Sequence, residues 1–143
     1  MVVLVDTNVI LDYLTLREPF CDSAKKVLRL CAEEKVQGYM AFHSVSNIFF
    51  ILRKTCDAGT RRELLKRICT MLTVTGASHE RVCNAIARDE FADFEDCLQD
   101  ECAKEIKADY IITRNVQDFN KADVAAIEPE VFLKLVCEAV QDA

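Results

Sequence analysis

Short runs of apolar, mostly β-branched residues alternate along the chain with longer stretches of helical periodicity. The runs cover residues 2–5, 39–42, 73–75, 110–113 and 125–127. Near-continuous apolar runs are typical of strands buried on both faces of a parallel sheet. Helical stretches separate the runs, so the order predicts a parallel sheet with helices on both faces. We therefore expect an α/β fold with three layers, α/β/α, and a central parallel sheet of four to five strands.

The helices are predicted from apolar residues that recur three and four positions apart. They are expected over 9–14, 24–31, 44–54, 64–72, 78–86 and 98–106, and from 129 onward. Asp22 or Ser23 is predicted to cap the second of these helices, and Ser78 the fifth. Asp57-Ala58-Gly59 is predicted to form a turn.

The length and composition point to one folded domain. The 143 residues, 51% of them hydrophobic and 29% charged, predict a single domain over 1–143. No apolar run approaches the ~20 residues needed to cross a bilayer. The start lacks a basic region and a small-residue cleavage site, so it does not resemble a signal peptide. We expect a cytoplasmic protein without membrane attachment.

The eight cysteines do not indicate a disulfide scaffold or a zinc site. Most of them fall within predicted helices, where cysteine serves as a small buried hydrophobe. The chain has no C-x-x-C pair and only two histidines, so the usual spacing of zinc ligands is missing.

The charge distribution gives a mixed indication. A net charge of −6 argues against a protein that holds nucleic acid by bulk electrostatics. Basic residues are nevertheless grouped at Arg53, Lys54, Arg61, Arg62, Lys66 and Arg67. This group is either a solvated helix face or a contact for backbone phosphates.

Four acidic residues stand where strands end or a helix begins. Asp6 follows the first strand, Asp118 follows the strand at 110–113, and Asp93 and Asp96 open the helix that precedes that strand. Each alone is explained as a helix or turn cap. Together they are expected to meet beyond the carboxyl ends of the strands, where parallel sheets place their sites.

Carboxylates held close together must either protonate or share a cation. Oxygen ligands without cysteine or histidine suit Mg²⁺ or Mn²⁺. Such ions activate water and bind the phosphodiester that it attacks. The chain has only three glycines, so a glycine-rich phosphate loop is not predicted.

Three segments carry a family resemblance. The opening V-V-L-V-D-T-N, with Asp6 as its first acid, resembles the start of PIN domains. Asp93-Phe94-Glu95-Asp96-Cys97-Leu98-Gln99 is similar to the family segment D-F-E-D-A-L-Q. The third segment, Ile111 to Phe119, is similar to the family ending T-R-N-x-x-D-F. The motifs occur in family order and the likeness covers nearly the whole chain.

The resemblance implies a Mg²⁺- or Mn²⁺-dependent endoribonuclease. Its family includes toxins that an antitoxin protein holds inactive, and many members form homodimers. Carried over, Asp6 and Asp96 are the main metal-binding acids, and Asp93 is a helper. Asn115 stands where many members have a fourth acid, and Asp118 is the nearest acid able to replace it.

The sequence departs from the family at a second position. A glutamate that is frequent early in the helix after strand two is replaced by Asn47. Asn47 and Asn115 are then expected to orient water or metal, with Thr113 supporting the loop from behind. With fewer charges in the pocket, we expect weaker metal binding and low activity.

Two alternatives remain. One is a catalytically weak or inactive PIN domain that binds RNA or a protein. The other is a phosphatase-like enzyme in which Asp6 is the nucleophile. That chemistry usually requires a second aspartate two residues later, where this chain has Asn8.

Overall fold

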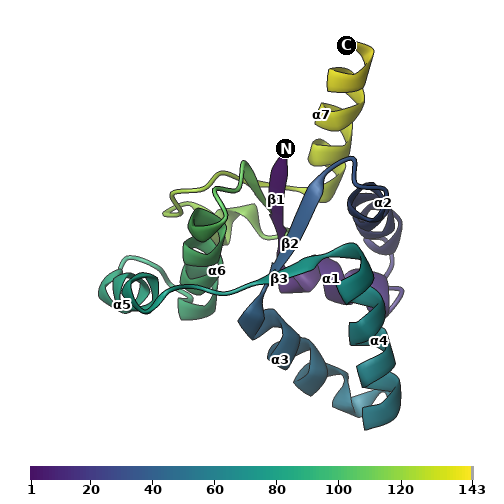
Figure 1. Cartoon of the computed structure of the whole chain (residues 1–143), viewed down its shortest axis with the longest axis horizontal. Coiled ribbons are helices and arrows are strands. Elements are labelled where there is room, and N and C mark those ends of the chain that lie inside the picture. The colour runs from purple at the N-terminus through teal and green to yellow at the C-terminus, as the bar shows by residue number, and fades with distance from the viewer. Residues whose placement is uncertain (143) are drawn as a thin grey trace.

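The computed structural model describes residues 1–142 and contains one five-stranded sheet (Figure 1). Its strand order is β3-β2-β1-β4-β5, and every neighbouring pair is parallel. The strands are β1 (Val2–Val5), β2 (Gln37–Ala41), β3 (Thr73–Thr75), β4 (Tyr110–Ile112) and β5 (Ala126–Ile127). The predicted three-layer α/β fold with four to five parallel strands is confirmed.

In this described part of the chain, seven α-helices and two short 3-10 helices connect the strands. The α-helices are α1 (Thr7–Leu14), α2 (Cys21–Ala32), α3 (Phe42–Ile51), α4 (Ala58–Met71), α5 (His79–Ala87), α6 (Phe94–Glu105) and α7 (Pro129–Gln141). The 3-10 helices are η1 (Leu52–Lys54), directly after α3, and η2 (Val116–Phe119), after β4.

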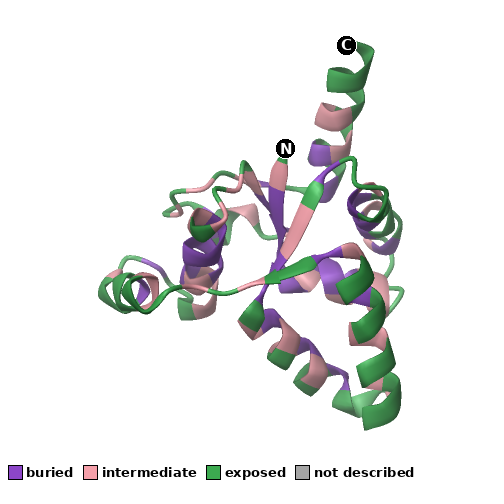
Figure 2. Ribbon diagram, in the orientation of Figure 1, coloured by how far each residue is buried: buried purple, intermediate pink, exposed green. Residues whose placement is uncertain are grey.

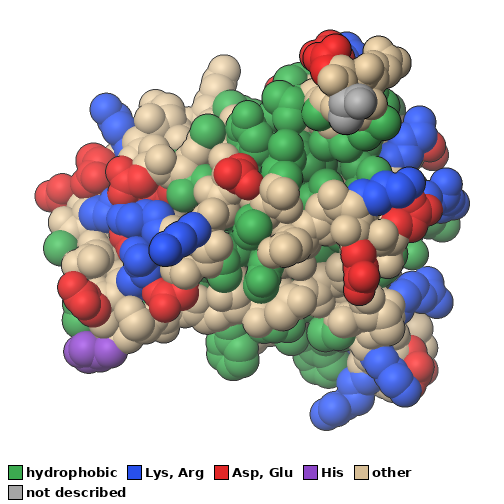
Figure 3. Space-filling model, turned by 45° about the horizontal axis from the view of Figure 1, so that its top comes forward, with side chains coloured by type: hydrophobic (Ala, Val, Ile, Leu, Met, Phe, Trp, Pro, Cys, Tyr) green, Lys and Arg blue, Asp and Glu red, His purple; other side chains and the backbone are tan. Residues whose placement is uncertain are grey.

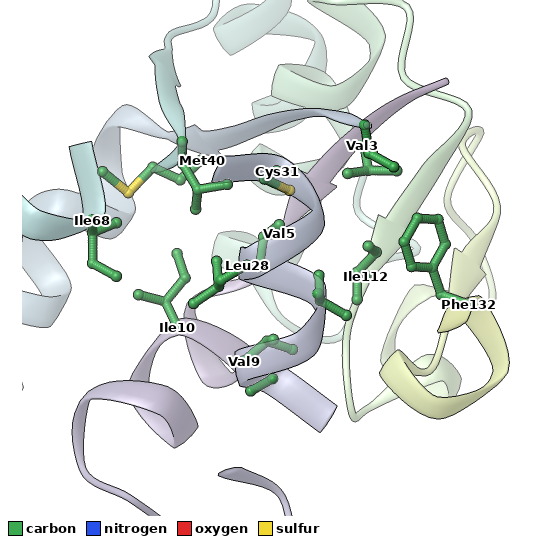
Figure 4. Packing of buried hydrophobic residues seen from close by; sticks show 14 of the residues in the cluster. Val3, Val5, Val9, Ile10, Leu28, Cys31, Met40, Ile68, Ile112 and Phe132 are labelled. Atoms are coloured by element: carbon green, nitrogen blue, oxygen red, sulfur yellow. The ribbon is translucent and has the colours of Figure 1, made fainter. Parts of the chain in front are cut away.

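The side chains of β1, β2, β4 and β5 alternate between two hydrophobic cores, as the pleat of a strand requires. Val3 and Val5 enter the larger core, which α1, α2, α4 and α7 cover (Figure 4). Leu4 enters the smaller core against α6. All three side chains are fully buried. The central strand is therefore buried on both faces, which explains its continuous apolar sequence.

Several predicted boundaries differ from the structure. Phe42 begins α3 and does not end β2, because the backbone turns after Ala41 and leaves the Phe42 side chain 70% exposed. Helix α4 begins at Ala58 and not at 64. The turn predicted at Asp57-Ala58-Gly59 is wrong, because Asp57 caps this helix and Ala58 and Gly59 form its first turn. The first turns of α4 are polar, so they give no apolar periodicity. Helix α2 begins at Cys21.

Of the caps predicted for α2 and α5, only the cap of α5 forms. The side chain of Ser78 accepts a hydrogen bond from the amide of Arg81 and caps α5, as predicted. Neither Asp22 nor Ser23 caps α2, whose N-cap position is occupied by Phe20. The Ser23 hydroxyl donates to the carbonyl of Phe20.

Burial is concentrated in the sheet and on the inward faces of the helices, whereas α4, α5 and the end of α7 are largely exposed (Figure 2). On the face shown in Figure 3, hydrophobic side chains gather beside α7 and mixed charges cover α5 and α6. All eight cysteines are free thiols. Within residues 1–142, the helices are too short or too polar to cross a membrane.

Gly38 in β2 is expected to tolerate no side chain. A Cβ atom there would lie 2.4 Å from Sγ of Cys31 and 2.7 Å from Cδ2 of Leu72, both buried. Gly38→Ala should lower the free energy of unfolding by about 1–3 kcal/mol, the usual cost of overpacking. Gly76→Ala is the matched control, since its Cβ would have no neighbour within 4 Å. Equal urea midpoints for the two variants would contradict the prediction.

Candidate metal centre

Asp6 lies at the junction of β1 and α1, with 6% of its surface exposed. One carboxylate oxygen, Oδ1, accepts a 2.8 Å hydrogen bond from the amide of Thr7. The other, Oδ2, accepts a 2.9 Å hydrogen bond from the hydroxyl of Thr113, at the end of β4. Strands β1 and β4 are neighbours, so the carboxylate is fixed between two strand ends.

The first turn of α6 supplies further acids. Asp93 caps the helix, accepting from the amides of Glu95 at 2.8 Å and Asp96 at 3.3 Å. Asp96 is half-buried. Its pKa is raised to about 7, mainly by burial, and then by the negative charges of Asp6, Asp93, Asp118 and Glu95. Asp96 therefore shares a negative environment with acids from three separate segments.

The pKa of Asp6 is raised to about 6, and burial is the main cause. The hydrogen bonds from Thr113 and Thr7 act in the opposite direction, and the charges of Glu95 and Asp118 raise it further. Burial, and after it the neighbouring acids, therefore disfavours the ionised form of both Asp6 and Asp96. A bound cation would remove that penalty.

The loop after β4 is organised around Thr113, whose side chain is fully buried. Besides donating to Asp6, its hydroxyl oxygen accepts from the side-chain amide of Asn8 at 3.3 Å and from the backbone amide of Asn115 at 3.1 Å. The side chains of Asn115 and Asp118 are exposed at the rim of this site. Thr113 thereby couples the loop to the buried acid.

The sequence prediction missed Glu95. Its carboxylate accepts a 2.7 Å hydrogen bond from the side-chain amide of Asn47 in α3. Glu95 also contributes to the raised pKa values of both Asp6 and Asp96. It stands between Asp93 and Asp96, whose i, i+3 spacing is that of a helix capping box and gives no indication of a role for the residue between them. The negative charge missing at Asn47 is therefore partly supplied from α6.

Most of the chain matches a known protein family. A PIN domain family model aligns with residues 2–117. The chain belongs to the PIN domain family. Comparison with curated protein sequences gives no significant match.

Several solved structures share the fold of this PIN domain. VapBC2 of Rickettsia felis, bound to a DNA fragment from its promoter, has a TM-score of 0.71 and 15% identity, covering 90% of this chain and 98% of that one. FitAcB of Neisseria gonorrhoeae has a TM-score of 0.66 and 21% identity, and the match covers 90% of this chain and 98% of that one. The sarcin–ricin-loop-cleaving toxin VapC20 of Mycobacterium tuberculosis has a TM-score of 0.59 and 16% identity, and the match covers 76% of this chain and 86% of that one. At these identities the likeness shows the fold.

A buried hydrogen-bond network in this PIN domain begins at Thr7, the residue after Asp6. The hydroxyls of Thr7 and Ser44 lie 2.8 Å apart, and the side-chain amide of Gln99 donates to Ser44 at 2.9 Å and to Thr7 at 3.3 Å. These three residues come from α1, α3 and α6. The network therefore holds the three helices that carry or flank the acids in one arrangement.

Arg114 fixes the loop after β4 from its other side. Its guanidinium donates to both carboxylate oxygens of buried Asp12, at 2.5 and 3.2 Å, and its Cζ lies 4.3 Å from the centre of the Phe20 ring. The backbone amide of Arg114 donates to Asn8 at 3.4 Å. Arg114 is therefore a positioning residue for Thr113 and Asn115.

The donor set fits a hard divalent cation that keeps part of its water. Within residues 1–142 there is no preformed group of three histidine, cysteine or acidic side chains arranged around one point. Each oxygen of the Asp6 carboxylate accepts one hydrogen bond and retains a lone pair. Mg²⁺ is usually held by one or two carboxylates plus water, whereas a closed cage of protein ligands is unusual for it.

The metal-free PIN domain should lose stability as pH rises, because the folded-state pKa of Asp6 lies above its unfolded value. That destabilisation is absent below about pH 4 and complete above about pH 7. A rise from 3.8 to about 6 corresponds to about 3 kcal/mol. Relative to wild type, Asp6→Asn should gain up to this amount between pH 4 and 8, measured by urea unfolding in EDTA. A pH-independent difference would contradict the prediction.

Proposed function

We propose that this PIN domain is a metal-dependent endoribonuclease of low intrinsic activity. The observation that carries the proposal is the gathering of Asp6, Glu95, Asp96 and Asp118 around one edge of the sheet, where burial, and after it the charges of neighbouring acids, raises the pKa values of Asp6 and Asp96. The family match and the shared fold with an RNA-cleaving toxin support it.

The proposed roles follow from the contacts. Asp6, Asp96 and Asp118 would hold Mg²⁺ or Mn²⁺, which when bound supplies Lewis-acid activation of water and of the phosphodiester. Asp93 orients the first turn of α6 through its cap and so places Asp96. Thr113 holds the Asp6 carboxylate in place, and Asn115, at the rim, is placed to orient water or a substrate oxygen.

Asn47 acts through Glu95. The hydrogen bond between them sets the Glu95 carboxylate on the α3 side of the site. Glu95 then supplies the negative charge that Asn47 lacks. Because the acids come from separate elements, the site binds and orients a phosphodiester only in the folded chain.

A protein partner and a homodimer are part of the proposal. Chains in the solved structures of VapBC2 and FitAcB have this fold, and so does a chain of a toxin–antitoxin complex from Klebsiella pneumoniae. An antitoxin would then cover the acidic site and hold it inactive. Co-expression with the product of a neighbouring small reading frame, followed by size-exclusion chromatography with light scattering, tests both points.

The activity test uses a panel of single-stranded RNAs with Mn²⁺, Mg²⁺ or EDTA. Cleavage that requires the metal is the expected result. Calorimetric titration with Mn²⁺ on the same preparation measures binding independently of cleavage. A protein that neither binds millimolar Mn²⁺ nor cuts any RNA would overturn the proposal.

The second candidate function is a PIN domain that binds RNA or protein without cutting. It is favoured by the neutral Asn47 and Asn115 and by the absence, within residues 1–142, of a preformed three-ligand group. RNA binding in EDTA together with no detectable Mn²⁺ binding would support it. The phosphatase-like alternative has less support, since Asn8 donates to Thr113 and offers no acid–base group.

A further inference from the structure

Helix α3 presents an aromatic stripe to solvent. Phe42 is 70% exposed and Phe50 is 61% exposed. They stand eight residues apart with exposed Ser46 between them, so all three lie on one side of the helix. Large exposed apolar side chains grouped in this way usually mark a binding surface.

The stripe borders the acidic site. Asn47, the residue after Ser46, lies on the adjoining side of α3 and donates to Glu95 at 2.7 Å. The three stripe residues span about 12 Å along the helix axis, at 1.5 Å per residue. An extended ligand lying on the stripe would therefore pass beside the carboxylate of Glu95.

Basic residues surround the end of the stripe that Phe50 forms. Residues 42–72 contain six basic and two acidic side chains, although the whole chain has a net charge of −6. Cζ of Arg53 lies 3.7 Å from the ring centre of Phe50, and Cζ of Arg61 lies 4.2 Å from that of Phe49. Figure 3 shows basic side chains gathered at the lower right, over α4.

A shallow hollow connects the stripe with α4. It is lined by Phe42, Val45, Ser46, Phe49, Arg62 and Leu65. Apolar surface thus meets exposed guanidinium groups along the line where α3 packs against α4. Flat apolar rings that stack bases, together with cations that contact phosphates, are the two elements of a surface for single-stranded nucleic acid.

We propose that this face of α3, η1 and α4, the arm surface, binds single-stranded RNA and leads it to the acidic site. The inference rests on the proposed ribonuclease function. Phe42 and Phe50, about 12 Å apart along the helix axis, stack on two bases of the same strand that are not neighbours, while Arg53 and Arg62 contact the phosphates. The acidic remainder of the chain repels RNA elsewhere, so the arm surface also sets the direction in which the strand lies.

The test measures binding of a fluorescein-labelled single-stranded RNA by anisotropy, in EDTA and at several salt concentrations. Phe42→Ala/Phe50→Ala should weaken binding at least about tenfold, since each stacked base contributes substantially. Arg53→Gln/Arg62→Gln should reduce the slope of log affinity against log salt by about 1.4, because each phosphate contact in a single strand contributes about 0.7.

Matched controls lie on α7 and α2, outside the arm surface. Val131→Ala/Val140→Ala removes two exposed apolar side chains of α7, and Lys25→Gln/Lys134→Gln removes two exposed cations of α2 and α7. Both controls should bind as wild type does. Circular dichroism and urea midpoints check that all variants are folded, and the salt slope would not change through a merely structural effect.

The outcomes separate this inference from the nuclease proposal. Wild-type affinity and salt slope in both arm variants would overturn the arm surface, even if the protein cleaves RNA. The arm surface would also be overturned as an RNA site if the arm variants lost the binding of a protein partner and kept wild-type RNA binding. Weaker RNA binding in the arm variants, with unchanged Mn²⁺ binding, would support it even if the wild-type protein does not cut.

Discussion

Asp6→Asn should reduce metal-dependent RNA cleavage by about 10²–10³-fold, the usual cost of removing one group that stabilises charge in a transition state. The amide would keep the size of the side chain and lose the charge that a cation requires. Asp96→Asn should have a similar effect, because the Asp96 carboxylate lies close enough to the other acids of the site for their charges to raise its pKa, after the larger effect of burial. Initial rates with saturating Mn²⁺, together with calorimetric Mn²⁺ titration, measure the loss.

The control for these variants is Asp22→Asn, which removes an exposed carboxylate of α2 that pairs only with Lys26. It should cleave RNA at the wild-type rate. Replacing a buried carboxylate of raised pKa with an amide removes a destabilising charge above about pH 6, but the amide oxygen can accept only one of the two hydrogen bonds from Thr7 and Thr113. Urea unfolding therefore checks that Asp6→Asn is folded. Unchanged cleavage in a folded Asp6→Asn variant would reject the metal centre.

Arg88→Met should lower the free energy of unfolding by about 3 kcal/mol, the largest stability change that we expect outside the core. Arg88 donates to Asp100 at 2.7 Å and to Glu101 at 3.0 Å, and both carboxylates are fully buried. It also donates to the carbonyl of Lys121 at 3.0 Å. The variant leaves two buried charges in α6 with fewer partners, which urea unfolding at pH 7 would measure.

The control for Arg88→Met is Lys26→Met, which breaks a 2.8 Å salt bridge between side chains that are both more than half exposed. Exposed pairs contribute little, so this variant should unfold as wild type does. Arg88→Lys should lie between the two, because lysine keeps the charge and loses the planar geometry that reaches several acceptors. Equal stability of Arg88→Met and Lys26→Met would contradict the prediction.

The order of strands and helices along this chain was predictable from its sequence, because short local patterns of apolar residues decide which segments become strands and which become helices. Residues 2–5 form a continuous apolar run, and in the structure β1 is buried on both faces. The first and last residues of helices were less predictable where the helix is exposed, because an exposed polar turn has no apolar periodicity to mark it. The first turns of α4 are exposed and polar, so the helix begins before its apolar periodicity does.

The approximate position of the acidic site was also predictable. Asp6 and Asp118 follow strands that pair side by side, and parallel strands end at a common edge. Local rules also anticipated the cap that Asp93 provides for α6. The metal-binding roles of Asp6, Asp96 and Asp118 stay predictions until metal binding is measured.

By itself, then, the sequence determined the layers, the strand polarity and the sheet edge at which Asp6 lies, because each depends on residues close together in the chain. Only the tertiary structure decided which distant side chains meet. The contact of Asn47 with Glu95 joins residues 48 positions apart, and that of Thr113 with Asp6 joins residues 107 positions apart. Such contacts depend on how α3, α6 and β4 pack around β1, which no local pattern records.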